Sequence, residues 1–421
     1  MATFTAVACL LGIAAILSFV NDRFLRLQHD IGLLLLAGLT TAGLRVLEFF
    51  VPSGLVGMLH QLTQSFNLND TLLKGVLCFL LFRGSVRVNW PALREQRWLV
   101  LWLAFAGTAI GCFVAGGLVY GGLAAFGVAV TLPQCLLFGA LIAATDPIAA
   151  LAILSKVGLP RNLETVIDGE SLLNDGVAVV LFTIFAGAAM GGSGGGGLSE
   201  AGAIFVREVL GGAAMGVAGW LAIHFLMLRS TSSCTSLLVS LGAVSAMYTA
   251  AQHLEISGPI ATVVAGLLSG NITAPRLSEE ARVPVRTFWS GLDEILNALL
   301  FVFVGFHVVL INPLQGVTLG IPGLVAIAAV LLSRSLAVAA IVGGLSAAAV
   351  IRADCFGLTK LLTWGGLRGG LSLALAVSLP DSPWKPLILN MTFAVVIFSI
   401  VVQGLTIGRM FTREDMARLL R

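Results

Sequence analysis

ATDPIAALAIL, residues 144–154, places an aspartate and a proline inside a mostly apolar run that covers residues 133–157. Pro147 has no N–H to donate and disfavours helical geometry at the preceding Asp146, so a helix here should break beside a carboxylate. Helices broken near the middle of a membrane free backbone carbonyls, which coordinate ions in transporters. We therefore expect a broken helix with Thr145 and Asp146 near an ion site. The alternative is a kink with a hydrogen-bonded Asp146.

The composition indicates that a lipid bilayer is the solvent of this chain. Of the 421 residues, 58% are hydrophobic and 11% are charged, whereas soluble globular proteins carry about 25% charged residues. The mean hydropathy of +1.00 agrees with this interpretation. The net charge of +3 indicates no nucleic-acid partner. The six cysteines lack C-x-x-C spacing and the histidines are scattered, so the sequence indicates no metal centre and no cofactor.

Thirteen segments qualify as candidate membrane-spanning helices, each of which needs about 20 mostly apolar residues. They are residues 3–20, 31–51, 72–88, 98–126, 133–157, 166–191, 202–228, 234–252, 257–270, 288–312, 319–348, 356–379 and 384–408. The tail after the last segment carries four arginines and alternate loops are basic, so the positive-inside rule places the C-terminus in the cytoplasm. An odd number of spans then puts the N-terminus outside. We expect a multi-pass protein of the inner (plasma) membrane of the cell.

A glycine-rich linker at residues 191–197 (GGSGGGG) separates the first six spans from the others. Spans 1–6 (about residues 3–191) and spans 8–13 (about 234–408) are interpreted as two six-helix halves of opposite orientation, with span 7 connecting them. Inverted repeats of this kind are common in secondary transporters. The expected fold is one all-α polytopic membrane domain over residues 1–421, ending in a short cytoplasmic tail at 409–421.

A polar cluster, DGESLLND at residues 168–175, enters the sixth span. Ser171 and Asp175 are four residues apart and share one helix face, and Glu170 and Asn174 share the neighbouring face. Two carboxylates, an amide and a hydroxyl make an oxygen-ligand set for a hard cation. Asp168 also fits a polar helix start at the cytoplasmic surface. Asp175 fits that reading poorly, because apolar sequence follows it directly.

Two further polar features lie in apolar spans. Arg334 lies between leucines deep in the span at 319–348, where a guanidinium needs an anionic partner unless it reaches the cytoplasmic surface. Asp293, Glu294 and Asn297 open the span at 288–312, and they either start that helix or lie near the ion path.

The motif WGGLRGGLS, residues 364–372, carries two G-x-x-x-G pairs in the twelfth span. Gly365 pairs with Gly369 and Gly366 with Gly370; such pairs let helices pack closely, or they let the helix unwind. In the repeat interpretation this span corresponds to the one that holds Pro147. Two interrupted helices at matching positions are the best sequence pointer to a transport site.

Four strings in this order resemble the monovalent cation:proton antiporters of the NhaP and NHE type. They are ATDPIAALAIL (144–154), DGESLLNDGVAVVLF (168–182), DEILNALLFVFVG (293–305) and WGGLRGGLSLALA (364–376). The resemblance covers nearly the whole chain. It implies a homodimer in which each protomer has a dimerisation domain and a six-helix core, with two broken helices crossing near Asp146.

The resemblance also implies roles for individual residues. Asp175 would bind the cation and the proton in turn. Thr145, Asp146, Ser171 and Asn174 would surround it, so that the Na⁺ ligands come from Asp175, Asp146, Ser171 and Thr145. Glu170 would pair with Arg334, with Arg368 close by.

One position departs from the family pattern. Some members carry an acidic residue near the ion site after the stretch Leu80-Leu81-Phe82, and here that position appears as Arg83. The choice of cation and the pH dependence are open at this point.

The sequence thus predicts a transporter and not an enzyme, one that exchanges Na⁺ or Li⁺ for H⁺ by alternating access for pH and sodium homeostasis. Because Asn174 cannot titrate and an arginine could hold Asp146 ionised, we expect electroneutral exchange. A K⁺/H⁺ antiporter of the same fold is the alternative. A passive channel would need a filter-like segment, and none is visible in the sequence. An intramembrane protease would need an opposed pair of catalytic carboxylates or a Ser–His pair, and no histidine lies within any of the four motifs.

Overall fold

The computed structural model describes residues 2–50, 76–190, 198–310 and 320–419, and every regular element in these ranges is a helix. Within these described ranges, eight helices are long and apolar enough to cross a membrane. They are Val7–Leu25, His29–Glu48, Arg97–Ala125, Arg161–Ala189, Gly202–Arg229, Ser233–His253, Ile321–Ala347 and Lys385–Met410. The chain is therefore an all-α polytopic membrane protein.

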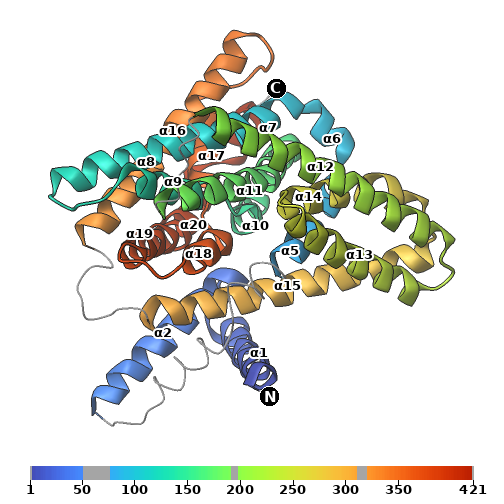
Figure 1. Cartoon of the computed structure of the whole chain (residues 1–421), viewed down its shortest axis with the longest axis horizontal. Helices are drawn as coiled ribbons and strands as arrows, with labels where there is room; N and C mark the ends of the chain where they lie inside the picture. The colour runs from blue at the N-terminus through green and yellow to red at the C-terminus, as the bar shows by residue number, and fades with distance from the viewer. Residues whose placement is uncertain (1, 51–75, 191–197, 311–319, 420–421) are drawn as a thin grey trace.

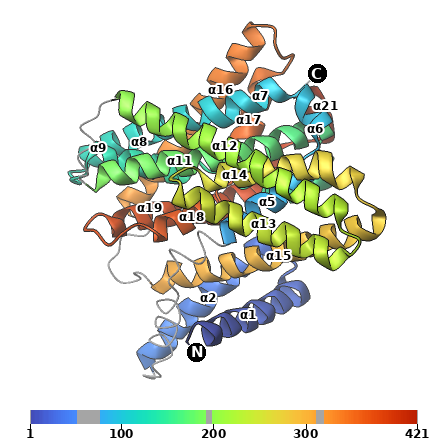
Figure 2. The same cartoon turned by 45° about the vertical axis from the view of Figure 1, so that its right-hand side comes forward.

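The helices form two groups (Figures 1 and 2). The central group contains α7 (Arg97–Trp102), α8 (Thr108–Ala125), α9 (Leu132–Ala143), α10 (Pro147–Val157), α11 (Arg161–Ala189), α16 (Ile321–Ala347), α17 (Cys355–Gly365), α18 (Gly370–Val377), α19 (Lys385–Phe398) and α20 (Gly404–Met410). The flanking group contains α1 (Ala2–Val20), α2 (His29–Phe50), α5 (Leu77–Arg87), α12 (Leu198–Arg229), α13 (Ser233–His253), α14 (Gly258–Leu268) and α15 (Glu279–Leu310). The remaining elements are the short α-helices α6 (Trp90–Glu95) and α21 (Arg413–Leu419) and the short π- or 3-10-helical turns η1 (Asn21–Leu25), η3 (Leu103–Gly107), η4 (Ser269–Thr273), η5 (Ala274–Arg276) and η6 (Ser399–Gln403).

Each group has its own apolar packing, and a shared cluster joins them. In the flanking group the rings of Phe82 and Trp289 pack against each other at a tilt of 49°, with centroids 4.7 Å apart. Where the groups meet, one buried cluster includes Leu33 of α2, Leu141 of α9 and Phe306 of α15. The two groups are thus held together largely by apolar contact.

The thirteen predicted spans each coincide with helical residues, but the number thirteen stays a prediction because several of these helices are short or broken. Helix α15 begins at Glu279, before the predicted span at 288–312, so Asp293, Glu294 and Asn297 lie well inside it and the alternative that they start the helix was wrong. Charged side chains in the first turns of α15 hid this start, because a helix can extend past its apolar segment. The linker at 191–197 and the start of the third predicted span, residues 72–75, lie outside the described residues.

The two predicted broken helices are confirmed. Helix α9 ends at Ala143 and α10 begins at Pro147, with three residues between them out of helical geometry. Likewise α17 ends at Gly365 and α18 begins at Gly370. The two breaks meet, since the backbone N–H of Asp146 donates to the carbonyl of Leu367 at 2.7 Å.

Candidate ion-binding site

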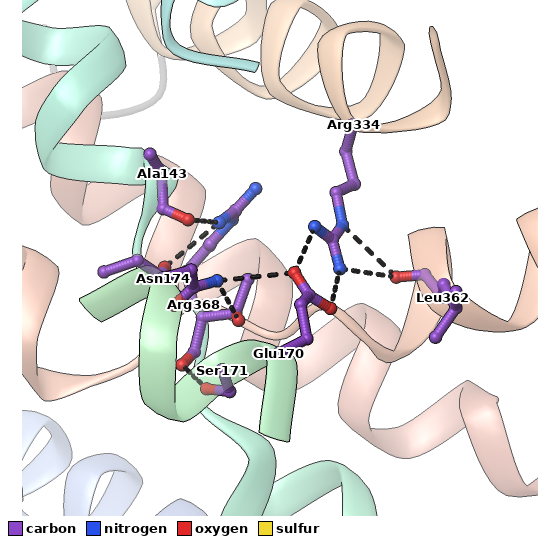
Figure 3. Close-up of polar contacts among 9 residues, drawn as sticks. Ala143, Glu170, Ser171, Asn174, Arg334, Leu362 and Arg368 are labelled. Atoms are coloured by element: carbon purple, nitrogen blue, oxygen red, sulfur yellow. Dashed lines mark hydrogen bonds and ion pairs between the residues drawn. The ribbon is translucent and has the colours of Figure 1, made fainter. Parts of the chain in front are cut away.

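The polar residues of α11 face the first break because α11 runs past it as an uninterrupted helix. Ser171 donates a hydrogen bond from its hydroxyl to the backbone carbonyl of Thr145. Asn174 donates from Nδ2 to the Thr145 hydroxyl at 2.7 Å (Figure 3). A carbonyl freed by a broken helix must find a donor inside the protein at membrane depth, and Ser171 supplies it. The structure therefore brings Thr145, Ser171 and Asn174 together.

Glu170 and Arg334 meet in a buried ion pair. The guanidinium donates to both carboxylate oxygens at 2.7 Å, and the two residues are 2% and 7% exposed. Arg334 also donates from Nε and Nη2 to the carbonyl of Leu362 at 3.3 Å (Figure 3). Leu362 lies in the last turn of α17, whose carbonyls have no partner within the helix. Arg334 thus neutralises Glu170 and caps α17 with one side chain.

Arg368, in the second break, caps the other broken helix. Its Nη1 donates to the carbonyls of Ala143 at 2.7 Å and Ala144 at 3.0 Å, at the end of α9. Its own backbone N–H donates to the hydroxyl of Ser399 at 2.9 Å. A cation at a helix C-terminus is favourable because the helix dipole is negative there. Arg368 is 5% exposed and lies close to the site, as the sequence comparison implied.

A cavity of about 120 Å³ opens beside these residues. Asp146, Asp175 and Ser372 lie in its wall, together with Thr145 and Ser171. The Oδ1 atom of Asp175 is buried and has no hydrogen-bond partner among the residues that the structure describes, and the same holds for the Ser372 hydroxyl. Carboxylate, hydroxyl and carbonyl oxygens converge here, and these are the ligands that hard cations prefer.

The glycines of the second break keep this site compact. A Cβ on Gly369 would lie 2.5 Å from Asp146 Oδ2, and a Cβ on Gly366 would lie 2.9 Å from Arg334 Nε. The WGGLRGGLS motif is therefore more than a surface for helix packing. Its small residues let the backbone of one break approach the side chains of its neighbours.

From the sequence, some of the cavity-lining residues had no predicted role, or only an uncertain one. Asp293, Asn297 and Asp168 line the same cavity, although the sequence marked them only as helix-start residues or as residues near the path. Ser372 ends the glycine motif but had no role in the sequence-based prediction, and Arg87 also lines the cavity, although nothing in the sequence signalled that it would. The position of Arg83 is different: its guanidinium donates to Ser290 Oγ at 3.3 Å, and Arg83 is not among the described lining residues.

Sequence comparison identifies the family to which this chain belongs. The family model described as "Sodium/hydrogen exchanger, transmembrane" matches residues 6–413. The chain belongs to this family. The Na⁺/H⁺ antiporter NhaP of Pseudomonas aeruginosa is 38% identical over 97% of this chain and 96% of its own length. The Na⁺/H⁺ antiporter NhaH of Halobacillus dabanensis is 35% identical over 84% of this chain and 86% of its own length.

The fold of this exchanger-family member agrees with a solved structure. The sodium proton antiporter MjNhaP1 from Methanocaldococcus jannaschii, in its structure at pH 8, superposes with a TM-score of 0.78. The match covers 100% of this chain and 99% of that one, at 20% sequence identity. The family match and the identity to NhaP confirm the membership predicted from the four sequence strings, and the family is one of transporters.

Proposed function

We propose that this protein exchanges Na⁺ or Li⁺ for H⁺ across a membrane, with Asp175 binding the cation and the proton in turn. One observation carries the proposal: a carboxylate oxygen of Asp175 is buried without a hydrogen-bond partner among the described residues, in the wall of a cavity beside two broken helices. Relatives that match nearly the whole chain are named Na⁺/H⁺ antiporters, which supports the same reaction.

The neighbours of Asp175 have distinct parts in this proposal. Asp146 adds a second carboxylate in the cavity wall, and Thr145 and Ser171 add neutral oxygens. Asn174 holds the Thr145 hydroxyl toward α11 through its amide. A cation that has lost part of its hydration shell then finds negative charge and dipolar oxygens together.

Exchange follows when the two ligands compete. A proton that arrives on Asp175 removes the charge that holds the cation, and only the neutralised site moves through the alternating-access transition, because moving an unpaired charge through the membrane is costly. Cation and proton fluxes are then coupled. At one-for-one exchange each pH unit supplies about 1.4 kcal/mol, which supports a cation gradient of roughly tenfold.

The charges around the site favour electroneutral exchange. Arg334 is engaged with Glu170, so that pair is balanced. The buried guanidinium of Arg368 reaches from the second break to the carbonyls at the end of α9, next to the break that holds Asp146, and can balance the Asp146 carboxylate through the cycle. Asp175 is then the single carboxylate that gains and loses a proton. We further propose a homodimer in the plasma membrane with the N-terminus outside and the C-terminus in the cytoplasm, in accord with the basic loops.

Everted membrane vesicles test this proposal. Addition of Na⁺ or Li⁺ to vesicles loaded with protons should release protons, and Asp175→Ala should abolish the release while the protein stays folded. Asp381→Ala is the control, because Asp381 lies in an exposed pair with Lys385. Full activity of purified Asp175→Ala would remove Asp175 from the mechanism. A response to K⁺ in place of Na⁺ would identify the protein as a K⁺/H⁺ antiporter.

A further inference from the structure

The cavity extends from Asp175 to an ion pair that joins the two helix groups. Arg87, at the end of α5, donates from Nη2 to Asp168 Oδ1 of α11 at 2.8 Å. Both residues line the cavity, and their side chains are 35% and 19% exposed. Asp168 lies about two helical turns before Asp175 on α11. The pair therefore lies at the more solvent-exposed end of the cavity, and the buried carboxylate of Asp175 lies deeper.

The pair connects two helices from different groups, which otherwise meet through apolar side chains such as Leu81 of α5 and Leu172 of α11. Arg87 belongs to the flanking group and Asp168 to the central group. Within the part of the chain that the structure describes, four other ion pairs each lie within one group or its adjoining loops: Arg207–Glu255, Arg282–Glu279, Arg334–Glu170 and Lys385–Asp381. A relative movement of the groups leaves such internal pairs intact, but it changes the distance between Arg87 and Asp168.

We propose that Arg87 and Asp168 form a clamp that stabilises the conformation in which the cavity reaches Asp175 from the cytoplasmic side, and that this clamp opens when the central group moves. The inference rests on the proposed exchange by alternating access. The shared interface is otherwise largely apolar, as in the cluster of Leu33, Leu141 and Phe306, and apolar contacts tolerate sliding better than a directional ion pair does. The clamp thus biases the equilibrium between the two conformations without contacting the transported ion.

The chemistry of the two residues suits this role. Arginine binds a carboxylate with a rigid planar fork and stays charged, so the pair persists over the working pH range of an exchanger. Partial exposure keeps the pair weak enough to break in each cycle, because exposed ion pairs contribute little while fully buried ones are costly to separate. Glu170 and Arg334 show the contrast: that pair is buried within the central group and has no reason to open.

Thiol accessibility from each side of the membrane tests the clamp. The probe is a membrane-impermeant cationic methanethiosulfonate, and the target is Asp175→Cys in a full-length chain whose native cysteines are replaced by alanine. Because this target does not transport, the readout is conformation and not activity. The ratio of labelling rates in inside-out and right-side-out vesicles measures how the two conformations are populated.

Arg87→Gln and Asp168→Asn should each lower the inside-to-outside ratio by about three- to fivefold, in line with the loss of a partly exposed pair. The charge swap R87D with D168R should restore the ratio to within about twofold of the parent, by the logic of a double-mutant cycle. Arg207→Gln, which breaks an exposed pair inside the flanking group, should leave the ratio unchanged. If Arg87→Gln fails to fold, Asp168→Asn tests the same pair from the other group.

An unchanged or increased ratio in the single variants would overturn the clamp, and so would a charge swap that behaves like the single variants. These outcomes differ from a failure of the proposed function. Labelling from one side alone in the parent and in every variant would contradict alternating access itself. Labelling from both sides with an unaltered ratio would contradict only the clamp.

Discussion

The backbone N–H of Asp146 and the carbonyl of Leu367 are joined by a 2.7 Å hydrogen bond, which ties the break of one helix to the break of the other. Two stretches more than two hundred residues apart in the chain thereby supply hydrogen-bond partners to each other's backbone. Each break exposes backbone groups that the membrane cannot satisfy, and the two breaks satisfy part of this need for each other. Asp146 is consequently held where the two halves of the site meet.

Gly369→Ala should disrupt this junction. The new methyl group would lie 2.5 Å from Asp146 Oδ2, whereas the extended backbone at Gly369 (φ −117°) accommodates alanine, so the effect is one of crowding. We expect a loss of about 1–3 kcal/mol in stability together with loss of exchange, measured by thermal unfolding in detergent and by vesicle transport. Gly343→Ala is the control, since nothing lies within 4 Å of its added Cβ. Equal behaviour of the two variants would show that the junction has room.

Ser171→Ala should leave the carbonyl of Thr145 without its donor. An unsatisfied buried polar group costs about 1–3 kcal/mol, so the variant should melt earlier and should need more Na⁺ for half-maximal exchange. Ser335→Ala is the matched control, because the Ser335 hydroxyl donates to a carbonyl of its own helix at Leu331, which the helix already supplies with a partner. Unaltered stability and sodium dependence in Ser171→Ala would mean that this hydroxyl has no part in the site.

Glu170→Gln and Arg334→Gln should each be strongly destabilising. Removing one partner of a buried ion pair costs about 3–5 kcal/mol because the other charge is left unpaired. The double variant should recover part of that loss, which detergent melting of all four proteins will measure. Additive losses would argue that the two side chains stabilise the fold separately, with Arg334 acting mainly on the carbonyl of Leu362.

The exchange rate in proteoliposomes should not depend on membrane voltage. If Asp175 alone exchanges a proton for a cation, no net charge crosses the membrane, whereas one net charge per cycle would be worth about 2.3 kcal/mol per 100 mV. The measurement uses a potassium-diffusion potential with Na⁺ as the substrate, so that K⁺ does not compete. A rate that changes steeply with the potential would show that a second proton is carried, with Asp146 as its carrier.

The sequence predicted those features that local chemistry alone decides: the break in the helix at Pro147 and the faces of α11 that carry the polar residues. Pro147 has to interrupt its helix, and the spacing of Ser171 and Asn174 places them on adjacent faces of any helix. Contacts between residues far apart in the chain could not be predicted in this way. Arg87 and Asp168 form an ion pair across 81 positions, and each residue considered alone fits the polar end of a loop. The start of α15 was missed for a related reason, because packing and not hydropathy decides where a helix with charged first turns begins.

Both helix groups contribute residues to the cavity wall, so substitutions can be placed on one side of the cavity and not on the other. The residues proposed to hold the cation all come from the central group, while Leu77, Leu80, Gly84, Asp293 and Asn297 in the opposite wall come from the flanking group. Ligand chemistry and access route are therefore encoded in different helices. Substitutions on α5 and α15 should change the rate at which ions enter the cavity and the size of the hydrated ion that it admits. They should leave the ligand residues on α11 unchanged.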